Sequence, residues 1–277
     1  YADRGFSGNP QDTGNDRTYS LDVLPQEFPC RLTGDFRSPV LDLVNADGSF
    51  GCDLRYQGYE ICDGKYNLKG LPAVYAAEEE AQTLIIYMKD QVTGLQVELL
   101  YGVLPEYDVI TRSAKVINTE EDKIRLTKAQ AACIDFLHGE FDVISFYGRH
   151  AMERNMQRTS VGHGAFVIGS RRGTSSHQYN PMMILAEKET TEDAGTCYGM
   201  SFVYSGGFKA EVEKDQFGQT RMQMGLQEEQ FSYPLKKGEE FVIPEVILTC
   251  SNQGLEKLSQ NLQRCIRKNL CRGKYKE

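Results

Sequence analysis

Residues 83–117, TLIIYMKDQVTGLQVELLYGVLPEYDVITRSAKVI, indicate the fold more clearly than any other part of the chain. Runs of β-branched, aromatic and other apolar residues at 83–89, 95–103 and 108–117 are separated by a Val-Thr-Gly turn and by a proline. Short runs divided by polar turns are typical of antiparallel strands, whereas βαβ units need helical segments between the strands. This stretch therefore predicts consecutive antiparallel strands.

The same pattern extends in both directions from this stretch. Upstream, the runs at 40–44 and 50–56 flank a turn at 45–48, which predicts a β-hairpin. Downstream, further strands are predicted at 123–136, 198–204, 207–213, 220–226 and 240–250. The predicted fold class is therefore all-β, a large antiparallel sandwich.

The two ends of the chain differ from this pattern. Residues 1–36 are rich in Gly, Asn, Asp and Pro, so we expect an extended arm and loops that lie on another surface. Residues 252–273 predict an amphipathic helix with Asn252 as its cap and Gly273 as its stop signal. Its apolar stripe consists of Leu255, Leu258, Leu262, Ile266 and Leu270. We expect this helix to link the sandwich to a further domain; the alternative is that it covers the sandwich edge.

The composition excludes several classes of protein. With 31 Lys and Arg against 39 Asp and Glu in 277 residues, the net charge is −8 with both signs mixed, so we expect no nucleic-acid partner. No apolar run approaches the roughly 20 residues that cross a bilayer, so we expect no membrane partner. The eight cysteines form no CxxC pair, which predicts buried free thiols in a reducing, cytoplasmic compartment.

Acidic and basic residues stand close together at three predicted turns. Asp3 and Arg17 each belong to an Asp-Arg pair, which is either a turn with a solvated arginine or a group that binds sugar hydroxyls. Asp35 and Arg37 lie in a turn that precedes a strand. We expect these two to form a structural pair.

No pattern in the chain indicates catalytic or metal chemistry. The four histidines, at positions 138, 150, 163 and 177, have no metal-ligand spacing, so no metal and no cofactor is expected. The polar stretch 169–181 contains serines and His177 but lacks a Gly-x-Ser-x-Gly elbow, so we expect a loop that lies against another surface, with ligand contact as the alternative. No pair of carboxylates can be singled out by spacing for glycoside hydrolysis.

Several motifs in their order along the chain resemble the amino-terminal β-supersandwich of bacterial α-galactosidases of glycoside hydrolase family 36. The motifs are Tyr19-Ser20-Leu21-Asp22, Leu24-Pro25-Gln26-Glu27-Phe28-Pro29, Gly34-Asp35-Phe36-Arg37-Ser38-Pro39, Gly70-Leu71-Pro72-Ala73, Asp108-Val109-Ile110-Thr111-Arg112-Ser113, Ser170-Arg171-Arg172-Gly173-Thr174-Ser175-Ser176-His177-Gln178, Val203-Tyr204-Ser205-Gly206 and Ser251-Asn252-Gln253-Gly254-Leu255.

This resemblance implies a domain organisation and an activity. The arm would occupy 1–36, the β-supersandwich 37–251, and the linking helix 252–273 would lead to a (β/α)8 barrel outside this chain. In the family that barrel holds the two catalytic aspartates for retaining hydrolysis of terminal α-galactosyl residues, as in melibiose and raffinose. The resemblance therefore implies that no catalytic residue lies in this chain, which is expected to be an inactive fragment that lacks residues before Tyr1.

The resemblance also implies substrate-binding residues. Family members are commonly tetramers in which the arm of one subunit completes the sugar pocket of its neighbour, and Asp3 and Arg17 match that role. A third contact matches the 148–154 stretch, where the family usually has Trp and this sequence has His150. Because His is smaller and more polar than Trp, the preferred sugar length is expected to differ.

The expected partners are α-galactoside sugars, the protein's own catalytic barrel and further copies of the chain in a tetramer. One alternative is a free-standing carbohydrate-binding module that acts without a barrel. Another is a different specificity on the same sandwich, such as that of an α-N-acetylgalactosaminidase.

Overall fold

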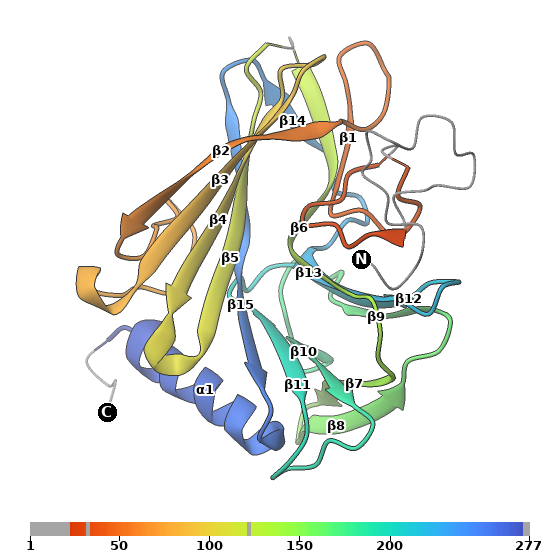
Figure 1. The fold of residues 1–277 in the computed structure, drawn as a ribbon, viewed down its shortest axis with the longest axis vertical. Helices are drawn as coiled ribbons and strands as arrows, with labels where there is room; N and C mark the ends of the chain where they lie inside the picture. The colour runs from red at the N-terminus through yellow and green to blue at the C-terminus, as the bar shows by residue number, and fades with distance from the viewer. Residues whose placement is uncertain (1–22, 32–33, 121–122, 274–277) are drawn as a thin grey trace.

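Two antiparallel β-sheets pack against each other, and one α-helix follows them in the part of the chain that the structure describes (Figure 1). A computed structural model describes residues 23–31, 34–120 and 123–273. The predicted all-β class with a C-terminal amphipathic helix is confirmed.

The larger sheet has nine strands in the order β2-β3-β4-β5-β15-β11-β10-β7-β8. The stretch 83–117 forms its consecutive strands β3, β4 and β5, as predicted. The nine strands are β2 (Leu54–Asp63), β3 (Gln82–Asp90), β4 (Gln96–Leu104), β5 (Val109–Ile117), β7 (Phe141–Arg149), β8 (Met152–Ser160), β10 (Tyr179–Glu187), β11 (Cys197–Phe202) and β15 (Glu240–Ser251).

The smaller sheet has six strands in the order β1-β6-β13-β12-β9, with β14 also paired to β6. These strands are β1 (Leu41–Val44), β6 (Lys123–Phe136), β9 (Gly164–Gly169), β12 (Phe208–Lys214), β13 (Thr220–Leu226) and β14 (Tyr233–Lys236). The predicted bounds of β6 and β13 agree with the structure at both ends.

Two apolar cores hold these layers together. The main core fills the space between the sheets and includes the fully buried Phe208, Met222 and Leu99. A second core joins the outer face of the nine-stranded sheet to helix α1 (Gly254–Asn269), whose Leu258 and Cys265 are fully buried. The apolar stripe of the helix therefore packs against the nine-stranded sheet of the same domain.

The predicted hairpin of residues 40–44 and 50–56 is wrong. The turn forms, since the Gly48 N–H donates to the Asn45 carbonyl at 3.0 Å, but the two strands then separate into different sheets. Strand β1 pairs with β6, while β2 begins only at Leu54 and pairs with β3. Strand β1 thus pairs with a longer strand far along the chain, and local alternation cannot indicate this choice.

The predicted ends of the helix also need correction. Gln253, and not Asn252, occupies the N-cap position, and no side chain caps the helix there. The helix ends at Asn269, before Gly273, where the N–H of the C-cap residue Leu270 donates to the Ile266 carbonyl.

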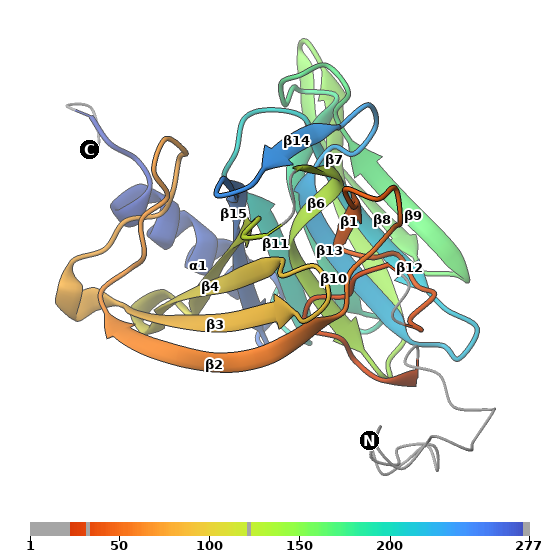
Figure 2. The ribbon, with the colours of Figure 1, turned by 90° about the horizontal axis from the view of Figure 1, so that it is seen from above.

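Residues 24–31 and 34–38, called here the arm root, contact the outer face of the six-stranded sheet. The register places Asp135, Arg221 and Glu213 on one face, opposite the core-facing Met222. The backbone of the arm root bonds to these polar side chains. The arm root and α1 lie on opposite sides of the domain (Figures 1 and 2).

Candidate functional site

The predicted sugar-contacting residues fall in different parts of the chain. Asp3 and Arg17 lie outside the described residues. His150 is exposed and lies in the turn between β7 and β8. The structure therefore describes one of the three predicted contacts, and the role of all three stays a prediction.

The β7–β8 turn that carries His150 has an unusual backbone. Ala151 in the turn and Arg154 near the start of β8 adopt positive φ angles, of 61° and 58°, a region that costs energy for residues with a side chain. The backbone also approaches itself closely, because a Cβ at Gly148 would lie 2.3 Å from the Met152 carbonyl oxygen. Such strain is found preferentially at functional turns, which favours a role for this hairpin tip.

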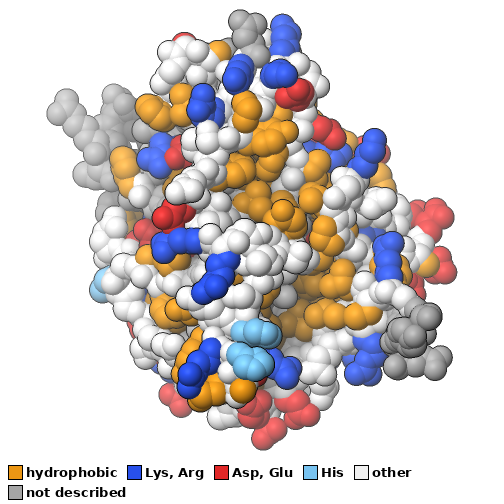
Figure 3. Space-filling model, turned by 180° about the vertical axis from the view of Figure 1, so that it is seen from behind, with side chains coloured by type: hydrophobic (Ala, Val, Ile, Leu, Met, Phe, Trp, Pro, Cys, Tyr) orange, Lys and Arg blue, Asp and Glu red, His pale blue; other side chains and the backbone are white. Residues whose placement is uncertain are grey.

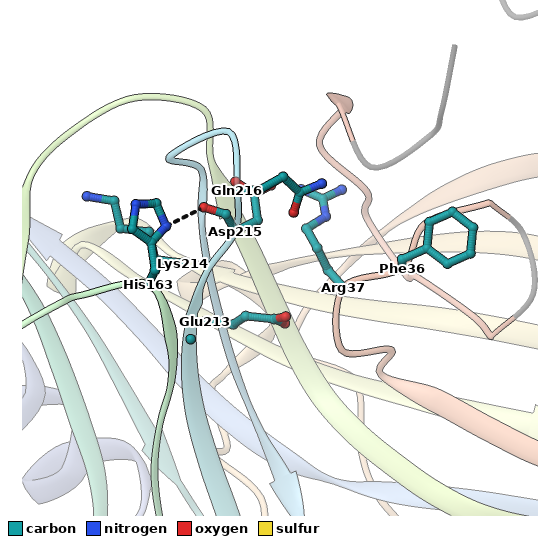
Figure 4. Close-up of a pocket in the computed structure, with 8 residues that line it drawn as sticks. Phe36, Arg37, His163, Glu213, Lys214, Asp215 and Gln216 are labelled. Carbon is teal, nitrogen blue, oxygen red and sulfur yellow. Dashed lines mark hydrogen bonds between the residues drawn. The ribbon is translucent and has the colours of Figure 1, made fainter. Parts of the chain in front are cut away.

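A pocket of about 510 Å³ opens between the arm root and the turn that joins β12 to β13. Figure 4 shows its side chains, with Phe36 turned away from the others. The pocket is lined by Phe36, Arg37, His163, Gly164, Glu213, Lys214, Asp215 and Gln216.

Both carboxylates of this pocket already bind the chain's own groups. Glu213 accepts the Ser38 backbone N–H at 2.8 Å. Asp215 accepts the N–H groups of Phe217 and Gln219 and the Gln219 side-chain amide. Carboxylates engaged in this way hold the turns in place.

Beneath this pocket lies a cluster of four charged residues, named here the arm clamp: Asp35, Arg37, Asp135 and Arg221. The exposed fraction of each side chain is 4% or less. Arg37 Nε donates to Asp35 at 2.9 Å, and Arg221 donates to both Asp35 and Asp135 at 2.7 Å. The expectation that Asp35 and Arg37 form a structural pair is confirmed.

Charge pairing in the clamp outweighs the cost of burial. Burial alone would raise the pKa of Asp35, but hydrogen bonds from Arg37 and the charge of Arg221 hold it below its ordinary value. Burial alone would likewise lower the pKa of Arg221, yet the hydrogen bond to Asp135 raises it. Asp35 and Arg221 therefore both remain charged at neutral pH.

Asp135 and Arg221 belong to strand segments whose sequences gave no sign of this role. They pair across β6 and β13, while Asp35 lies 186 residues before Arg221. A charged residue on each of two predicted strands was the available signal, and it could not be distinguished from solvent-facing polar positions.

Side chains of the polar loop 169–181 bond both within the loop and to neighbouring segments of the chain. Ser170 Oγ donates to the Thr174 carbonyl at 2.6 Å, and Arg172 Nε donates to Gln178 at 3.2 Å. Arg171 forms an ion pair with Glu229. The predicted contact with another surface stays a prediction.

Residues 23–31, 34–120 and 123–273 show neither a metal-binding cluster nor a membrane-spanning helix. These residues contain no group of three or more His, Cys, Asp or Glu side chains that could hold a metal ion. No helix among them is long and apolar enough to span a membrane.

Comparison with known proteins places nearly all of the chain in one family. The family described as glycosyl hydrolase family 36 N-terminal domain matches residues 2–236. The chain is 61% identical, over 99% of its length, to the bifunctional alpha-galactosidase/sucrose kinase AgaSK of Mediterraneibacter gnavus. It is 43% identical, again over 99% of its length, to the alpha-galactosidase Mel36A of Lactobacillus acidophilus.

Solved structures agree with this comparison. The galactosidase domain of AgaSK matches all of the chain with a TM-score of 0.94. The alpha-galactosidase AgaA of Geobacillus stearothermophilus, solved in complex with stachyose, matches 99% of it with a TM-score of 0.93 and 42% identity. The chain spans only 29% of the length of full AgaSK and 38% of the length of Mel36A.

Proposed function

The chain belongs to the glycosyl hydrolase family 36 N-terminal domain family, and on this basis we propose that it is the N-terminal domain of an α-galactosidase. The whole enzyme would hydrolyse terminal α-galactosyl residues of melibiose- or raffinose-type sugars. One observation carries this proposal: the similarity to α-galactosidases extends over 99% of the chain at up to 61% identity.

The hydrolysis itself is assigned to a part of the enzyme outside this chain. Relatives about three times as long leave room for a catalytic barrel after the linking helix. Two aspartates in that barrel would cleave the galactoside with retention, one as nucleophile and one as acid and base. Glu213 and Asp215, the carboxylates of the pocket beside the arm root, both accept backbone N–H groups, in keeping with this division of labour.

We assign this domain the role of completing the sugar pocket of a neighbouring subunit in a tetramer. Asp3 would accept hydrogen bonds from galactose hydroxyls, and Arg17 would orient Asp3 or donate to the next sugar. His150 would take the place of a Trp, on a hairpin tip whose strained backbone supports a functional role. The division into an arm at 1–36, a sandwich at 37–251 and a linking helix at 252–273 is part of the same proposal.

The surface offers a place for the barrel. Hydrophobic side chains gather in a hollowed band on the face behind the view of Figure 1 (Figure 3). Phe146, Met182 and Val203, which are only partly buried, belong to the outer core that α1 also covers. Apolar patches of this kind mark contact surfaces, so we assign this side of the domain to the barrel.

A cytoplasmic location is proposed from the thiols. All eight cysteines lie among the described residues and none forms a disulfide. Proteins with many unpaired cysteines are typical of reducing compartments.

Two experiments test the proposal. The coding sequence beyond residue 277 should encode a (β/α)8 pattern with aspartates at strand ends. Calorimetric titration of the isolated chain with galactose, melibiose and raffinose should show weak or no binding, because the pocket is completed by another subunit. A stop codon directly after residue 277 together with tight galactoside binding would favour a free-standing carbohydrate-binding module.

A further inference from the structure

We infer that Arg221 and Asp135 are positioning residues for substrate binding: the arm clamp fixes the direction in which the arm leaves the sandwich. The consequence for catalysis rests on the proposed function, in which residues of the arm complete a sugar pocket. The clamp itself rests on the geometry of described residues alone.

The clamp is built on the sheet. Arg221 and Asp135 are directly opposite each other on β13 and β6, with exposed side-chain fractions of 0% and 1%. Two parallel hydrogen bonds of 2.7 Å join the guanidinium to the carboxylate. A bidentate pair between two central strands gives a fixed platform.

The arm root binds this platform through its backbone as well as its side chains. The Gln26 N–H donates to Asp135 at 2.9 Å, and Arg221 donates to the Ser38 carbonyl at 3.0 Å. Arg37 adds a hydrogen bond of 2.6 Å to the Leu24 carbonyl. The clamp therefore holds both ends of the arm root, at Leu24 and at Ser38.

Stability alone does not account for these charges. A buried ion network is often no more stabilising than apolar side chains of similar volume, because each charge loses its hydration. Met222, the neighbour of Arg221 on β13, shows that the strand also places a large apolar side chain in full burial on its other face. Charged groups with fixed directions add geometric specificity that apolar packing does not supply.

A second buried ion pair provides a matched control. Lys65 and Glu245 are joined at 2.6 Å with exposed side-chain fractions of 1% and 0%, and Glu245 also accepts the Val74 N–H. Glu245 lies on β15 of the nine-stranded sheet and Lys65 in the loop after β2, and the pair has no bond to the arm root among the described contacts. Lys65→Met therefore breaks an equally buried ion pair without releasing the arm.

The test compares Arg221→Met, Arg221→Lys and Lys65→Met. In the isolated chain, hydrogen exchange measured by mass spectrometry should show faster exchange over residues 24–38 for Arg221→Met and not for Lys65→Met.

In the longer enzyme, Arg221→Met should raise KM for raffinose about tenfold or more while kcat changes less than about twofold, because the catalytic groups stay in place. Arg221→Lys keeps the positive charge but loses the planar set of guanidinium donors, so its exchange rate over residues 24–38 and its KM should lie between those of the wild type and Arg221→Met. If Arg221→Met fails to fold, Arg221→Lys replaces it in both measurements.

Each other outcome overturns a defined part of the inference. Unchanged exchange at 24–38 in Arg221→Met would show that the clamp does not hold the arm. Faster exchange with an unchanged KM, or an equal rise of KM in Lys65→Met, would refute the positioning role. A longer protein that cleaves no α-galactoside would refute the proposed function and with it the catalytic consequence, while the exchange result would still decide whether the clamp exists.

Discussion

Arg221 on strand β13 donates a hydrogen bond of 2.7 Å to Asp35 in the arm root, 186 residues earlier in the chain. Both side chains are almost completely buried, with exposed fractions of 0% and 1%. The contact makes the arm root an integral layer of the fold, because it joins the outer face of the six-stranded sheet to a segment with no strand of its own. The following predictions test this architecture and its proposed use.

Acid should destabilise the domain through Asp35. The folded-state pKa of Asp35 lies below its ordinary value, so the unfolded chain binds more protons and the free energy of unfolding rises with pH. This contribution is complete above the unfolded pKa of about 3.9 and is lost as pH falls through the folded value. Urea unfolding should show that the free energy of unfolding falls between pH 6 and pH 3. Asp35→Asn should be less stable than the wild type at pH 6, and its free energy of unfolding should fall less steeply with pH below pH 4. An equal dependence of the free energy of unfolding on pH in the two proteins would contradict this assignment.

Two phenylalanines should respond in opposite ways to truncation. Phe36 is 84% exposed, so Phe36→Ala should change the free energy of unfolding by less than about 0.5 kcal/mol. Phe208 is fully buried in the main core, and Phe208→Ala should cost about 3–5 kcal/mol. Denaturant unfolding of the isolated chain measures both. A large loss of unfolding free energy in Phe36→Ala would contradict its exposure and would mean that this ring packs against other residues of the chain.

The hairpin tip beside His150 should tolerate no side chain at Gly148. A Cβ there would lie 2.3 Å from the Met152 carbonyl oxygen, so Gly148→Ala should destabilise the chain by about 1–3 kcal/mol. Gly58 on β2 has no atom within 4 Å of an added Cβ, and Gly58→Ala should be neutral or slightly stabilising. Thermal unfolding compares the two variants. Equal effects would show that the close approach at Gly148 is absent.

The thiols should react in an order set by burial. Cys250 and Cys271 are exposed and should be alkylated first by iodoacetamide in the native chain. Burial raises the pKa of Cys133 to about 12 and that of Cys265 to about 11, so both should react only after unfolding. Mass spectrometry of labelled peptides identifies each site. Early labelling of Cys133 in the folded chain would contradict the packing of β6.

Much of the sandwich could be predicted because its central strands have a simple pattern. Strands β6 and β13 were placed with correct bounds from runs of β-branched and apolar residues between turns. Strand β8 was not predicted, since its sequence MERNMQRTS is polar and most of its residues are exposed at the sheet edge. The pairing of β1 with β6 could not be predicted from the sequence either, because pairing between distant strands depends on the whole sheet.

The candidate site could be predicted less well than the fold. The sequence indicated that Asp35 and Arg37 pair, since they stand two residues apart in a turn. It could not indicate Asp135 or Arg221, which join them only after β6 and β13 have paired. Local spacing thus predicted the pair of Asp35 and Arg37, whereas the two clamp residues on β6 and β13 depend on tertiary pairing.

Proton NMR of raffinose hydrolysis by the longer enzyme tests the central claim most directly. The account predicts release of galactose and sucrose, with α-galactose appearing before mutarotation produces the β-anomer, because a retaining mechanism keeps the configuration at the anomeric carbon. Initial release of β-galactose would contradict the retaining mechanism. No release of galactose from raffinose, melibiose or an aryl α-galactoside would contradict the assignment of this chain to an α-galactosidase.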